Sequence, residues 1–396
     1  MRTSVGRVPV GIVGAGPAGL LLSHLLHLAG IESVVLEARS REYVERRVRA
    51  GVLEQPTVDL LREVGIAERL DREGMPHHGL SLRFDAADHR IALTELTGRC
   101  ITVYGQQEVV KDLIAARLAA DGRIEFEVTG VALHDIDGDA PRISYVDAAG
   151  RPAELRCDVV AGCDGFHGIC RPSIPAGVLT EYQHTYPFAW LGILAKTPPS
   201  HAELIYTHHE RGFALHSMRS PELTRLYLQV DPDEDIADWP DERVWAELAA
   251  RLAVDGEFTL HEGPLLDKGV TPMRSFVVEP MRYRRLFLAG DAAHIVPPTG
   301  AKGMNLAVAD VRVLARALTA LLKENRTDLA ESYSDTCLRR VWRAEHFSWW
   351  MTSMLHRFGE HDAFQRRLQL SQLRYTVTST AAATSLAENY VGLPFD

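Results

Sequence analysis

Three glycines near the start of the chain have the spacing of a turn that binds a pyrophosphate. Gly14, Gly16 and Gly19 form the pattern G-x-G-x-x-G between an apolar run, residues 8–13, and a leucine-rich run, residues 20–29. These runs predict a buried strand and a helix packed on its sheet. In that setting the first glycine permits the tight turn, the second lets a phosphate approach the backbone, and the third lets the helix pack closely. The helix N-terminus would supply unpaired N–H groups to the phosphates.

Glu37 stands where such a fold places an acid near a ribose. The apolar run 33–36 predicts a second strand, and Glu37 follows it, 18 residues after Gly19. A carboxylate at that position reaches ribose hydroxyl groups. Strand, glycines, helix, strand and acid, in this order, predict a dinucleotide-binding fold, and they leave FAD and NAD as alternatives.

Two later segments favour FAD. A short apolar strand, residues 285–289, leads into Gly290-Asp291 and then into the glycine-rich turn 300–305, and Cys163-Asp164-Gly165 follows the predicted strand 158–161. An acid at the end of a strand can hold a ribityl hydroxyl, and a glycine-rich turn that opens a helix can present N–H groups to a flavin. Together with the first motif, these segments resemble the three fingerprints of the class A flavoprotein aromatic hydroxylases.

The resemblance extends over nearly the whole chain and is closest to the members of that family that act on 4-hydroxybenzoate. It is carried by seven segments: residues 49–55, 103–106, 162–168, 274–280, 290–305, 347–353 and 387–394. It implies an FAD-dependent monooxygenase that uses O₂ and NADPH or NADH. A flavin hydroperoxide would deliver a hydroxyl group to the ring carbon beside a phenolate and yield 3,4-dihydroxybenzoate (protocatechuate), while the protein positions and dries the site.

A carboxylate site is predicted on two strands, residues 211–219 and 223–230. In the first strand, alternation puts Ser217 and Arg219 on one face, where a hydroxyl and a guanidinium could bind one carboxylate together. In the second strand, Tyr227 matches the third carboxylate ligand that the resemblance implies. The alternative is that these residues form the solvent-facing side of an antiparallel sheet.

The other end of the implied substrate is a phenol, whose ionisation needs help from the protein. A free phenol has a pKa of about 10, so ionising it at neutral pH costs roughly 4 kcal/mol, and the ring reacts well only as the phenolate. The resemblance implies that Tyr206 hydrogen-bonds the substrate oxygen, that Tyr390 is the next link, and that His77 exchanges protons with water at a pKa near 6.5. His78 is a rival for that last role. The backbone carbonyl of Pro298 would be a further acceptor at the ring.

The resemblance also assigns residues to FAD. They are Gly14, Gly16, Gly19, Glu37, Arg47, Arg49, Gln106, Asp164, Arg225, Asp291, Lys302, Gly303 and Asn305. Among them, Glu37 would hold the adenosine ribose, Asp291 the ribityl chain, and Lys302 would face the anionic reduced flavin, although a surface lysine is the commoner alternative. The flavin ring would move between an inner site for hydroxylation and an outer site for reduction.

The nicotinamide coenzyme has no second Rossmann domain in this family. The positions that match coenzyme contacts are Tyr43, Arg47, His167, Arg171 and Arg274. Ala38 stands where strongly NADPH-selective members often carry a basic residue, and Arg39 or Arg41 could compensate. Because a 2′-phosphate prefers a guanidinium group, we expect NADPH, with NADH also usable.

The composition is that of an ordinary globular protein and argues against several classes. The chain has 396 residues, 46% of them hydrophobic, and a formal net charge of −10, so it lacks the basic character that suits nucleic-acid binding. Its five cysteines include no C-x-x-C pair, which indicates a reducing compartment and argues against a metal site. Residues 8–31 carry no Asp, Glu, Lys or Arg, but the glycines and histidines within them argue against a signal peptide or membrane span. We therefore expect a cytoplasmic protein.

The predicted fold is α/β, with a Rossmann-like FAD-binding domain interleaved with a sheet-rich substrate-binding domain. The FAD-binding domain would comprise residues 1–75, 101–180 and 274–350, the substrate-binding domain residues 76–100 and 181–273, and the C-terminal helical segment and tail residues 351–396. The resemblance implies a homodimer. Two alternatives stay open: an FAD-dependent hydroxylase of another substituted benzoate, and a non-catalytic flavin redox sensor that engages a protein partner.

Overall fold

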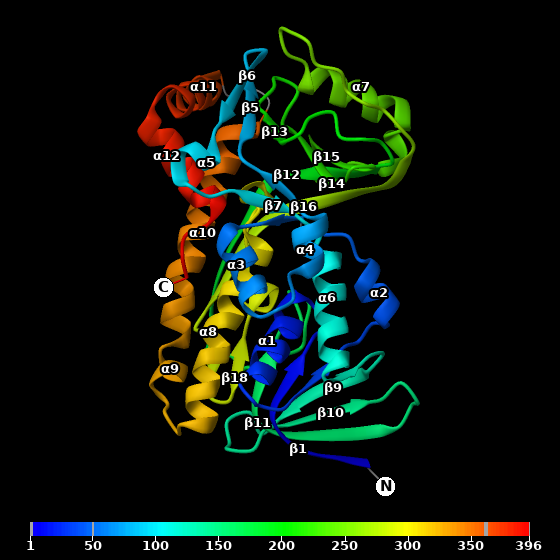
Figure 1. The fold of residues 1–396 in the computed structure, drawn as a ribbon, viewed down its shortest axis with the longest axis vertical. Coiled ribbons are helices and arrows are strands. Elements are labelled where there is room, and N and C mark those ends of the chain that lie inside the picture. The colour runs from blue at the N-terminus through cyan, green and yellow to red at the C-terminus, as the bar shows by residue number, and fades with distance from the viewer. Residues whose placement is uncertain (1–2, 50, 360–362, 396) are drawn as a thin grey trace.

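The structure is a computed structural model that describes residues 3–49, 51–359 and 363–395. Two large sheets lie toward opposite ends of an elongated molecule (Figure 1). A smaller sheet contains β3 (Val52–Leu53), β7 (Ile101–Val103) and β4 (Met75–His77). In Figure 1, β7 lies between the two large sheets.

The first sheet places the predicted cofactor segments at one edge. Its main path has the order β17 (Arg282–Tyr283), β18 (Leu286–Leu288), β11 (Pro152–Gly162), β1 (Thr3–Val13), β2 (Ser33–Leu36) and β8 (Arg123–Glu125), and β10 (Arg142–Val146) and β9 (Thr129–His134) extend it beside β11. β1, β2, β8, β11 and β18 are parallel. Because the carboxyl ends of parallel strands meet at one edge, the turns after β1, β11 and β18 gather there. Gly14, Asp164 and Asp291 lie in those turns.

The strand and helix around the glycine turn are both longer than the apolar runs that predict them. α1 (Pro17–Leu28) lies beside α6 (Gln106–Ala119) and α8 (Gly303–Lys323) (Figure 1). Its first residue is a proline, which suits a first helical turn because the missing N–H would have no helical partner there. Pro9 falls inside β1 and not at its start. β2 pairs with β1 only from Val10 onward, so Pro9 interrupts no pair on that side.

The second sheet carries the predicted substrate residues. Its order is β19 (His294–Ile295), β16 (Leu265–Glu279), β12 (Thr180–Ala195), β15 (Leu223–Val230), β14 (Ala214–Ser220), β13 (Leu204–Thr207), β5 (Leu80–Phe84) and β6 (Ala87–Ile91). The predicted strand 223–230 is confirmed. The strand predicted over 211–219 begins only at Ala214, because Gly212 has a φ of +106°, outside extended geometry.

The two faces of the second sheet pack against different helices. One face, with Leu226 and Leu228, is buried against α7 (Asp241–Leu252). The other face, with Tyr206 and Leu215, belongs to a core shared with α10 (Tyr333–Leu355), α11 (Ala363–Thr378) and α12 (Thr380–Val391). The predicted substrate residues are on this second face, so the solvent-facing alternative is wrong.

One long helix and two long strands connect the two ends of the molecule. α10 buries Val341 in the core of the first sheet and Met351 in the core of the second. β12 and β16 pair from Thr180 and Glu279 at one end to Ala195 and Leu265 at the other. α10 therefore reaches from the first sheet to the second and positions the C-terminal helices against the second sheet (Figure 1).

Candidate active site

The glycine turn after β1 leaves open space at Gly16. Gly14 has a φ of +103°, and a Cβ atom there would lie 2.3 Å from the carbonyl oxygen of Cys163. A Cβ atom on Gly19 would lie 2.0 Å from the carbonyl oxygen of Gly14. Within the described part of the chain, no heavy atom lies within 4 Å of the corresponding position at Gly16. Two glycines are thus required by packing, and the third faces free space at the N-terminus of α1, which is the geometry a pyrophosphate needs.

Glu37 lies directly beside this turn. Its Oε2 atom accepts a hydrogen bond from the N–H of Ala15 at 2.8 Å, and its Oε1 atom accepts one from the N–H of Arg39 at 2.8 Å. Both bonds come from backbone groups, so they fix the carboxylate without neutralising it. The carboxylate is placed to accept further hydrogen bonds from a ribose.

Asp291 follows β18 and is exposed at the same edge of the sheet. The guanidinium groups of Arg47 and Arg49 are close enough to act on its charge. Both arginines are exposed, in the segment that follows α2 (Arg41–Arg46), and Gln106 is the half-buried first residue of α6. The two guanidinium groups therefore gather beside Asp291, near the end of β18.

A buried ion pair supports the turn that carries Asp291. Asp310 Oδ2 accepts a hydrogen bond from the N–H of Gly290 at 2.9 Å and lies 2.6 Å from Nε2 of His294. Burial alone would lower the pKa of His294, but Asp310 raises it overall. The imidazole and the carboxylate thus hold the turn by a charge-assisted hydrogen bond.

Asp164 is turned toward its own loop. Its Oδ2 atom accepts a hydrogen bond from the N–H of Cys170 at 2.8 Å, and a Cβ atom on Gly168 would lie 2.1 Å from its Cγ atom. Burial raises the pKa of this carboxyl group. Its Oδ1 atom has no hydrogen-bond partner among the residues that the structure describes. Oδ1 is therefore the oxygen of Asp164 without a described partner, and the expected contact of Asp164 with FAD stays a prediction.

Ser217, Arg219 and Tyr227 converge as the sequence predicts. Arg219 donates hydrogen bonds to Ser217 Oγ at 3.1 Å and to the hydroxyl of Tyr227 at 3.3 Å. Burial would raise the pKa of Tyr227, but Arg219 and Arg225 lower it overall. The Nε atom of Arg219 is buried and has no partner among the described residues. A guanidinium with a free donor, flanked by two hydroxyls, is suited to a carboxylate ligand.

Arg225 adds a second positive charge beside this cluster. Its guanidinium carbon lies 5.2 Å from the centre of the Tyr227 ring, and its Nη1 atom lies 3.6 Å from Asp267 Oδ2. Its buried Nε and Nη1 atoms make no hydrogen bond within the described residues. A ligand with negative charge would therefore meet two arginines on this face of the sheet.

Tyr206 lies on the same face and in the same cross-strand row as Tyr227, two strands away, with Leu215 between them. Tyr206 pairs with Leu215, and Leu215 pairs with Tyr227 on the next strand. Since neighbouring strands are about 4.8 Å apart, the backbones at Tyr206 and Tyr227 are separated by about 10 Å. The hydroxyl of Tyr206 is 2.5 Å from that of Tyr390, and burial raises the pKa of both phenols. An aromatic ring with a carboxylate at one end and an oxygen at the other fits this spacing.

His77 has different surroundings from those expected. It is 2% exposed, and neither of its ring nitrogens has a partner among the described residues. Burial lowers its pKa to about 4, so it is not the exposed imidazole with a pKa near 6.5 that we expected. His78 is exposed, and its Nδ1 atom lies 2.9 Å from Thr94 Oγ1.

The backbone carbonyl of Pro298, the expected further acceptor at the substrate ring, already accepts a hydrogen bond from the N–H of Ala301 at 3.0 Å. One lone pair of this oxygen remains for a ligand.

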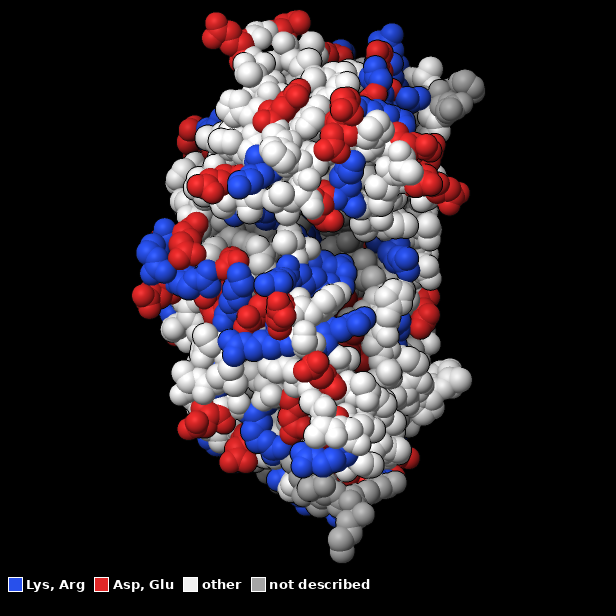
Figure 2. Space-filling view, turned by 90° about the vertical axis from the view of Figure 1, so that its right-hand side faces the viewer, with Lys and Arg blue, Asp and Glu red and all other residues white. Residues whose placement is uncertain are grey.

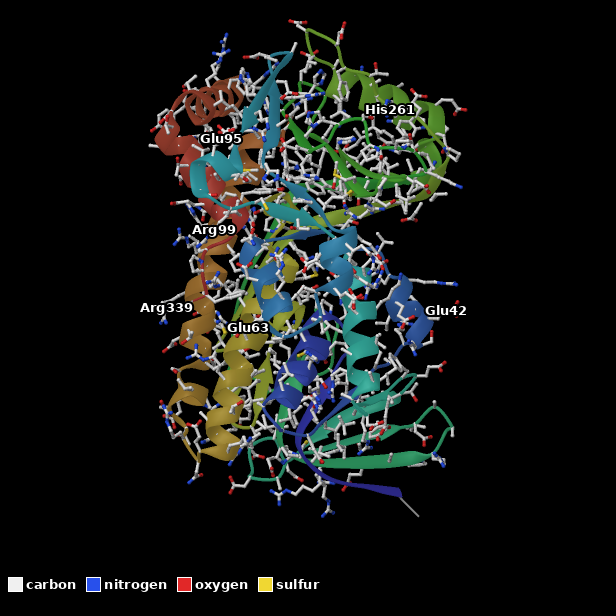
Figure 3. The ribbon with its side chains drawn as sticks, in the orientation of Figure 1. Glu42, Glu63, Glu95, Arg99, His261 and Arg339 are labelled. Atoms are coloured by element: carbon white, nitrogen blue, oxygen red, sulfur yellow. The ribbon has the colours of Figure 1, made fainter. Side chains whose placement is uncertain are left out.

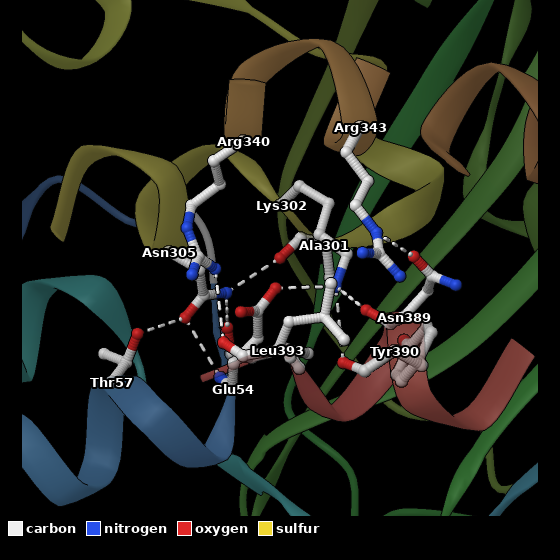
Figure 4. Close-up of polar contacts among 12 residues, drawn as sticks. Glu54, Thr57, Ala301, Lys302, Asn305, Arg340, Arg343, Asn389, Tyr390 and Leu393 are labelled. Carbon is white, nitrogen blue, oxygen red and sulfur yellow. Dashed lines mark hydrogen bonds and ion pairs between the residues drawn. The ribbon is translucent and has the colours of Figure 1, made fainter. Parts of the chain in front are cut away.

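Lys302 is buried between Glu54 and the C-terminal helix (Figure 4). Its Nζ atom donates to Glu54 Oε1 at 2.6 Å and to the carbonyl oxygens of Asn389 and Tyr390. Burial lowers the pKa of the ammonium group, and Glu54 opposes that shift. Lys302 therefore joins three parts of the chain and does not stand free toward a flavin. The sequence assigned no role to Glu54, although an acid next to an apolar strand was a signal that could have been used.

Asn305 also uses its side chain inside the protein. Its Oδ1 atom accepts hydrogen bonds from the N–H of Glu54 at 3.0 Å and from Thr57 Oγ1 at 2.8 Å. Its Nδ2 atom donates to the carbonyl oxygens of Val52 and Ala301 at 3.1 and 2.9 Å (Figure 4). Gly303 is the first residue of α8. Asn305 thus holds the start of this helix against the segment around Glu54.

The expected coenzyme residues gather around Phe166. The guanidinium carbons of Arg171 and Arg274 lie 4.8 and 5.0 Å from the centre of the Phe166 ring, and the ring of His167 packs edge-on against it at 4.9 Å. Arg171 is fixed further by donating to the carbonyl oxygens of Ala292 and Phe166. His167 and Arg171 from one segment and Arg274 from a distant one therefore form one cluster around Phe166.

Tyr43 and Arg47 form a second part of the expected coenzyme site. Arg39 and Arg47 lie over the Tyr43 ring, with guanidinium carbons 5.3 and 5.9 Å from its centre. Figure 2 shows basic side chains gathered in a band across the middle of the molecule, on the side that carries α2 in Figure 1. Such a band is suited to the phosphates of a coenzyme.

An aromatic wall beside the carboxylate cluster was missed by sequence reasoning. Trp190 stacks on Phe213 with ring centres 5.2 Å apart, and its Nε1 atom donates to Nε2 of His356 at 2.7 Å. The Tyr227 ring lies 4.8 Å from that of Trp190. Scattered aromatic residues give no periodic signal, so only the folded chain brings them together.

Neither a metal cluster nor a membrane-spanning helix is found in the part of the chain that the structure describes. It contains no group of three or more His, Cys, Asp or Glu residues that could hold a metal ion. Nor is any of its helices both long and apolar enough to cross a membrane.

Comparisons with known proteins identify the family. Residues 7–348 match the family described as FAD binding domain. The chain is 47% identical over 391 residues to p-hydroxybenzoate hydroxylase of Acinetobacter baylyi, covering 98% of this chain and 96% of that protein. It is 28% identical over 357 residues to aklavinone 12-hydroxylase of Streptomyces purpurascens, covering 83% of this chain and 65% of that protein.

Solved structures show the same fold. The crystal structure of p-nitrophenol 4-monooxygenase from Pseudomonas putida DLL-E4 superposes with a TM-score of 0.82 at 22% identity, covering 98% of this chain and 99% of that one. The matched family spans both the glycine turn and the Asp291 segment, and the 47% identical relative extends the match to the C-terminal helices. The chain therefore belongs to the FAD-binding domain family and is a relative of p-hydroxybenzoate hydroxylase.

Proposed function

We propose that the protein is an FAD-dependent monooxygenase that converts 4-hydroxybenzoate to 3,4-dihydroxybenzoate with O₂ and NAD(P)H. One observation carries the proposal: a carboxylate-binding cluster around Arg219 and the paired hydroxyls of Tyr206 and Tyr390 lie on one face of a sheet, with Tyr206 two strands away from Tyr227. The 47% identity to p-hydroxybenzoate hydroxylase supports the same substrate.

At the carboxylate end, Arg219 binds the substrate and fixes its direction. Its guanidinium donates charge-assisted hydrogen bonds to the carboxylate, and the hydroxyls of Ser217 and Tyr227 donate further ones. Arg225 adds positive charge beside the Tyr227 ring. Because the carboxylate is held at this end, the phenol oxygen of the substrate points across the strands toward Tyr206.

At the phenol end, Tyr206 and Tyr390 stabilise the phenolate. Burial raises the pKa of both tyrosines, so they remain protonated and can donate in series, Tyr390 to Tyr206 and Tyr206 to the substrate oxygen. Offsetting the roughly 4 kcal/mol cost of ionisation needs such donors in a dry site. We propose that His77, buried and neutral, passes the released proton on toward water without holding it, because a pKa of about 4 makes its protonated ring a strong acid.

FAD fits the edge of the first sheet. The open space at Gly16 would take the pyrophosphate, Glu37 the adenosine ribose and Asp291 the ribityl chain. When bound, FAD supplies the oxygen-activating chemistry after reduction by the coenzyme. We assign it to a discontinuous domain of residues 1–75, 101–180 and 274–350, with NADPH at the clusters around Phe166 and Tyr43. Substrate binding falls to residues 76–100 and 181–273, and Tyr390 comes from the C-terminal segment 351–396.

We also propose a cytoplasmic homodimer that serves the breakdown of aromatic compounds. Exposed aromatic residues on α10 and α11, Trp349, Phe364 and Tyr375, support an interface there. The free thiols of all five cysteines support a reducing compartment. Size-exclusion chromatography with light scattering tests the dimer, which a monomeric mass at micromolar concentration would contradict.

A product assay tests the activity. The FAD-loaded protein is given 4-hydroxybenzoate and O₂, with NADPH and NADH in parallel, and we expect 3,4-dihydroxybenzoate in near-equal amount to the coenzyme oxidised. Hydrogen peroxide as the only product would refute the proposal. A higher product yield from a ring isomer or an aminobenzoate would instead identify a hydroxylase of another substituted benzoate.

A further inference from the structure

Five backbone carbonyl groups near the end of the chain are bound by cationic side chains. They belong to Asn389, Tyr390, Gly392, Leu393 and Pro394. Lys302 binds the first two, the second at 3.5 Å; Arg99 binds the third at 3.3 Å; and Arg340 binds the last two, with 3.2 Å to Leu393. Figure 4 shows Lys302 and Arg340 reaching this segment from two sides. We name these three cations the tail clamp.

The tail clamp matches the electrostatics of a helix end. The last four carbonyls of an α-helix have no helical partner, and the helix dipole places negative partial charge there. α12 ends at Val391, so the clamp binds both its last turn and the residues just beyond it. Chain ends fray unless something ties them down, and here three separate elements contribute a cation.

Gly392 lets the tail fit between the clamp and Glu54. It has a φ of +90°, and a Cβ atom there would lie 2.3 Å from Glu54 Oε2. The other oxygen of Glu54 accepts the hydrogen bond from Lys302 at 2.6 Å. The tail is therefore held from both sides immediately after Tyr390.

We infer that the tail clamp sets the position of the Tyr390 hydroxyl and that Arg340 is a positioning residue for ionisation of the substrate phenol. This inference rests on the proposed function, which places Tyr390 at the phenolate end. Arg340 acts at a distance: its guanidinium donates to the carbonyls of Leu393 and Pro394, and its guanidinium carbon lies 5.2 Å from the centre of the Phe395 ring. A hydrogen bond weakens steeply with distance and angle, so a shifted tail would weaken the donor to Tyr206.

The experiment compares Arg340→Gln with Arg339→Gln. Arg339 is the preceding residue of α10 and lies on its outer side, exposed to solvent (Figure 3). Each FAD-loaded variant is saturated with 4-hydroxybenzoate, and ultraviolet difference spectra give the fraction bound as phenolate at pH 8. We expect the ratio of bound phenolate to bound phenol to fall roughly threefold in Arg340→Gln, equivalent to a rise of about half a unit in the pKa of the bound phenol, and the product formed per NADPH to fall with it. We expect the rate of flavin reduction in Arg340→Gln, and all three readouts in Arg339→Gln, to stay within twofold of wild type.

A second variant separates position from charge. A chain that ends at Gly392 keeps Arg340 but removes both carbonyls that it binds, so we expect the same loss of phenolate as in Arg340→Gln. FAD content shows whether each variant folds, and the truncated chain decides if Arg340→Gln does not. A normal phenolate fraction in the folded truncated chain would overturn the inference, because any effect of Arg340 would then come from its charge on nearby Lys302. Wild-type protein that forms no product would refute the proposed function and not the clamp, since the spectrum of the bound phenol is read independently of turnover.

Discussion

The hydroxyl of Tyr206 lies 2.5 Å from the hydroxyl of Tyr390, although 184 residues separate them along the chain. Tyr206 comes from the middle of the second sheet, and Tyr390 comes from the last turn of the last helix. Both phenols are almost fully buried. A hydrogen-bonded pair in such surroundings can donate toward a ligand on the same face of the sheet, and it depends on the C-terminal segment being held in place.

Replacing Tyr206 by Phe should separate hydroxylation from flavin reduction. The ring and its packing remain, but the substrate oxygen loses its donor, so we expect product formation to fall by roughly a hundredfold. Stopped-flow absorbance should show flavin reduction by NADPH within a fewfold of wild type. Tyr182→Phe is the control, because Tyr182 is 45% exposed. Equal losses in both steps for Tyr206→Phe would contradict the role of this tyrosine.

Replacing Arg219 by Ala should weaken binding of the aromatic carboxylate by about 2–5 kcal/mol, as expected when one partner of a desolvated charge pair is lost. Isothermal titration with 4-hydroxybenzoate measures the change on the FAD-loaded protein. Arg211→Ala provides the comparison, since Arg211 is an exposed residue paired with Glu247 just before the same strand. Unchanged affinity in Arg219→Ala would move the carboxylate site elsewhere.

Glu345 should make the protein less stable as the pH rises. It is 5% exposed, and burial raises its pKa to about 7. Below pH 4 both the folded and the unfolded chain carry the proton; between about pH 4.3 and 7 the unfolded chain has lost it while the folded chain keeps it. The contribution of Glu345 to the free energy of unfolding is therefore present in acid and is lost as the pH rises through 7.

The variant Glu345→Gln removes this titration. The free energy of unfolding of Glu345→Gln relative to wild type should rise by about 2 kcal/mol between pH 5 and pH 8, from urea unfolding of the FAD-loaded proteins. The difference isolates Glu345 because every other group titrates in both proteins. Glu331→Gln, at an exposed position, should show no such change. A pH-independent difference for Glu345→Gln would mean that its carboxyl group titrates normally.

Gly392→Ala should lower the stability of the protein by more than the strain that a positive φ imposes on an alanine. Gly150→Ala is the matched control, because Gly150 also has a positive φ, +74°, but no described heavy atom within 4 Å of its Cβ position. The added methyl group at position 392 would meet Glu54, which cannot move freely while it binds Lys302. We expect Gly392→Ala to lose about 1–3 kcal/mol of stability in excess of the control. Equal losses in thermal or urea unfolding would show that Glu54 yields.

The sequence predicts elements well where one local pattern suffices. The strand 223–230 and the parallel pairing of β1 with β2 follow from apolar runs and the glycine turn between them. The convergence of Ser217 with Arg219 follows from alternation along one strand. Their position on the buried face of the sheet does not, because alternation says which side chains share a face but not what covers it.

Long-range contacts explain the remaining differences. Burial of His77 depends on the segments packed around it, so its low pKa could not be read from its neighbours in sequence. Lys302 has the features of a residue that faces a charged cofactor, yet its ammonium group binds Glu54 and the end of α12, 248 and about 90 residues away.

Local sequence by itself determined the cofactor-binding turn, the acid that follows it and the strands. It also supplied side chains of the types that can bind an aromatic acid. These depend on backbone geometry and side-chain periodicity within a few residues. The tertiary structure alone decided which of those groups meet: the row from Tyr206 to Tyr227, the pairing with Tyr390, and the cations that hold the tail. Such contacts arise only when packing brings distant segments together, and they are fixed by burial and hydrogen-bond geometry that no local pattern contains.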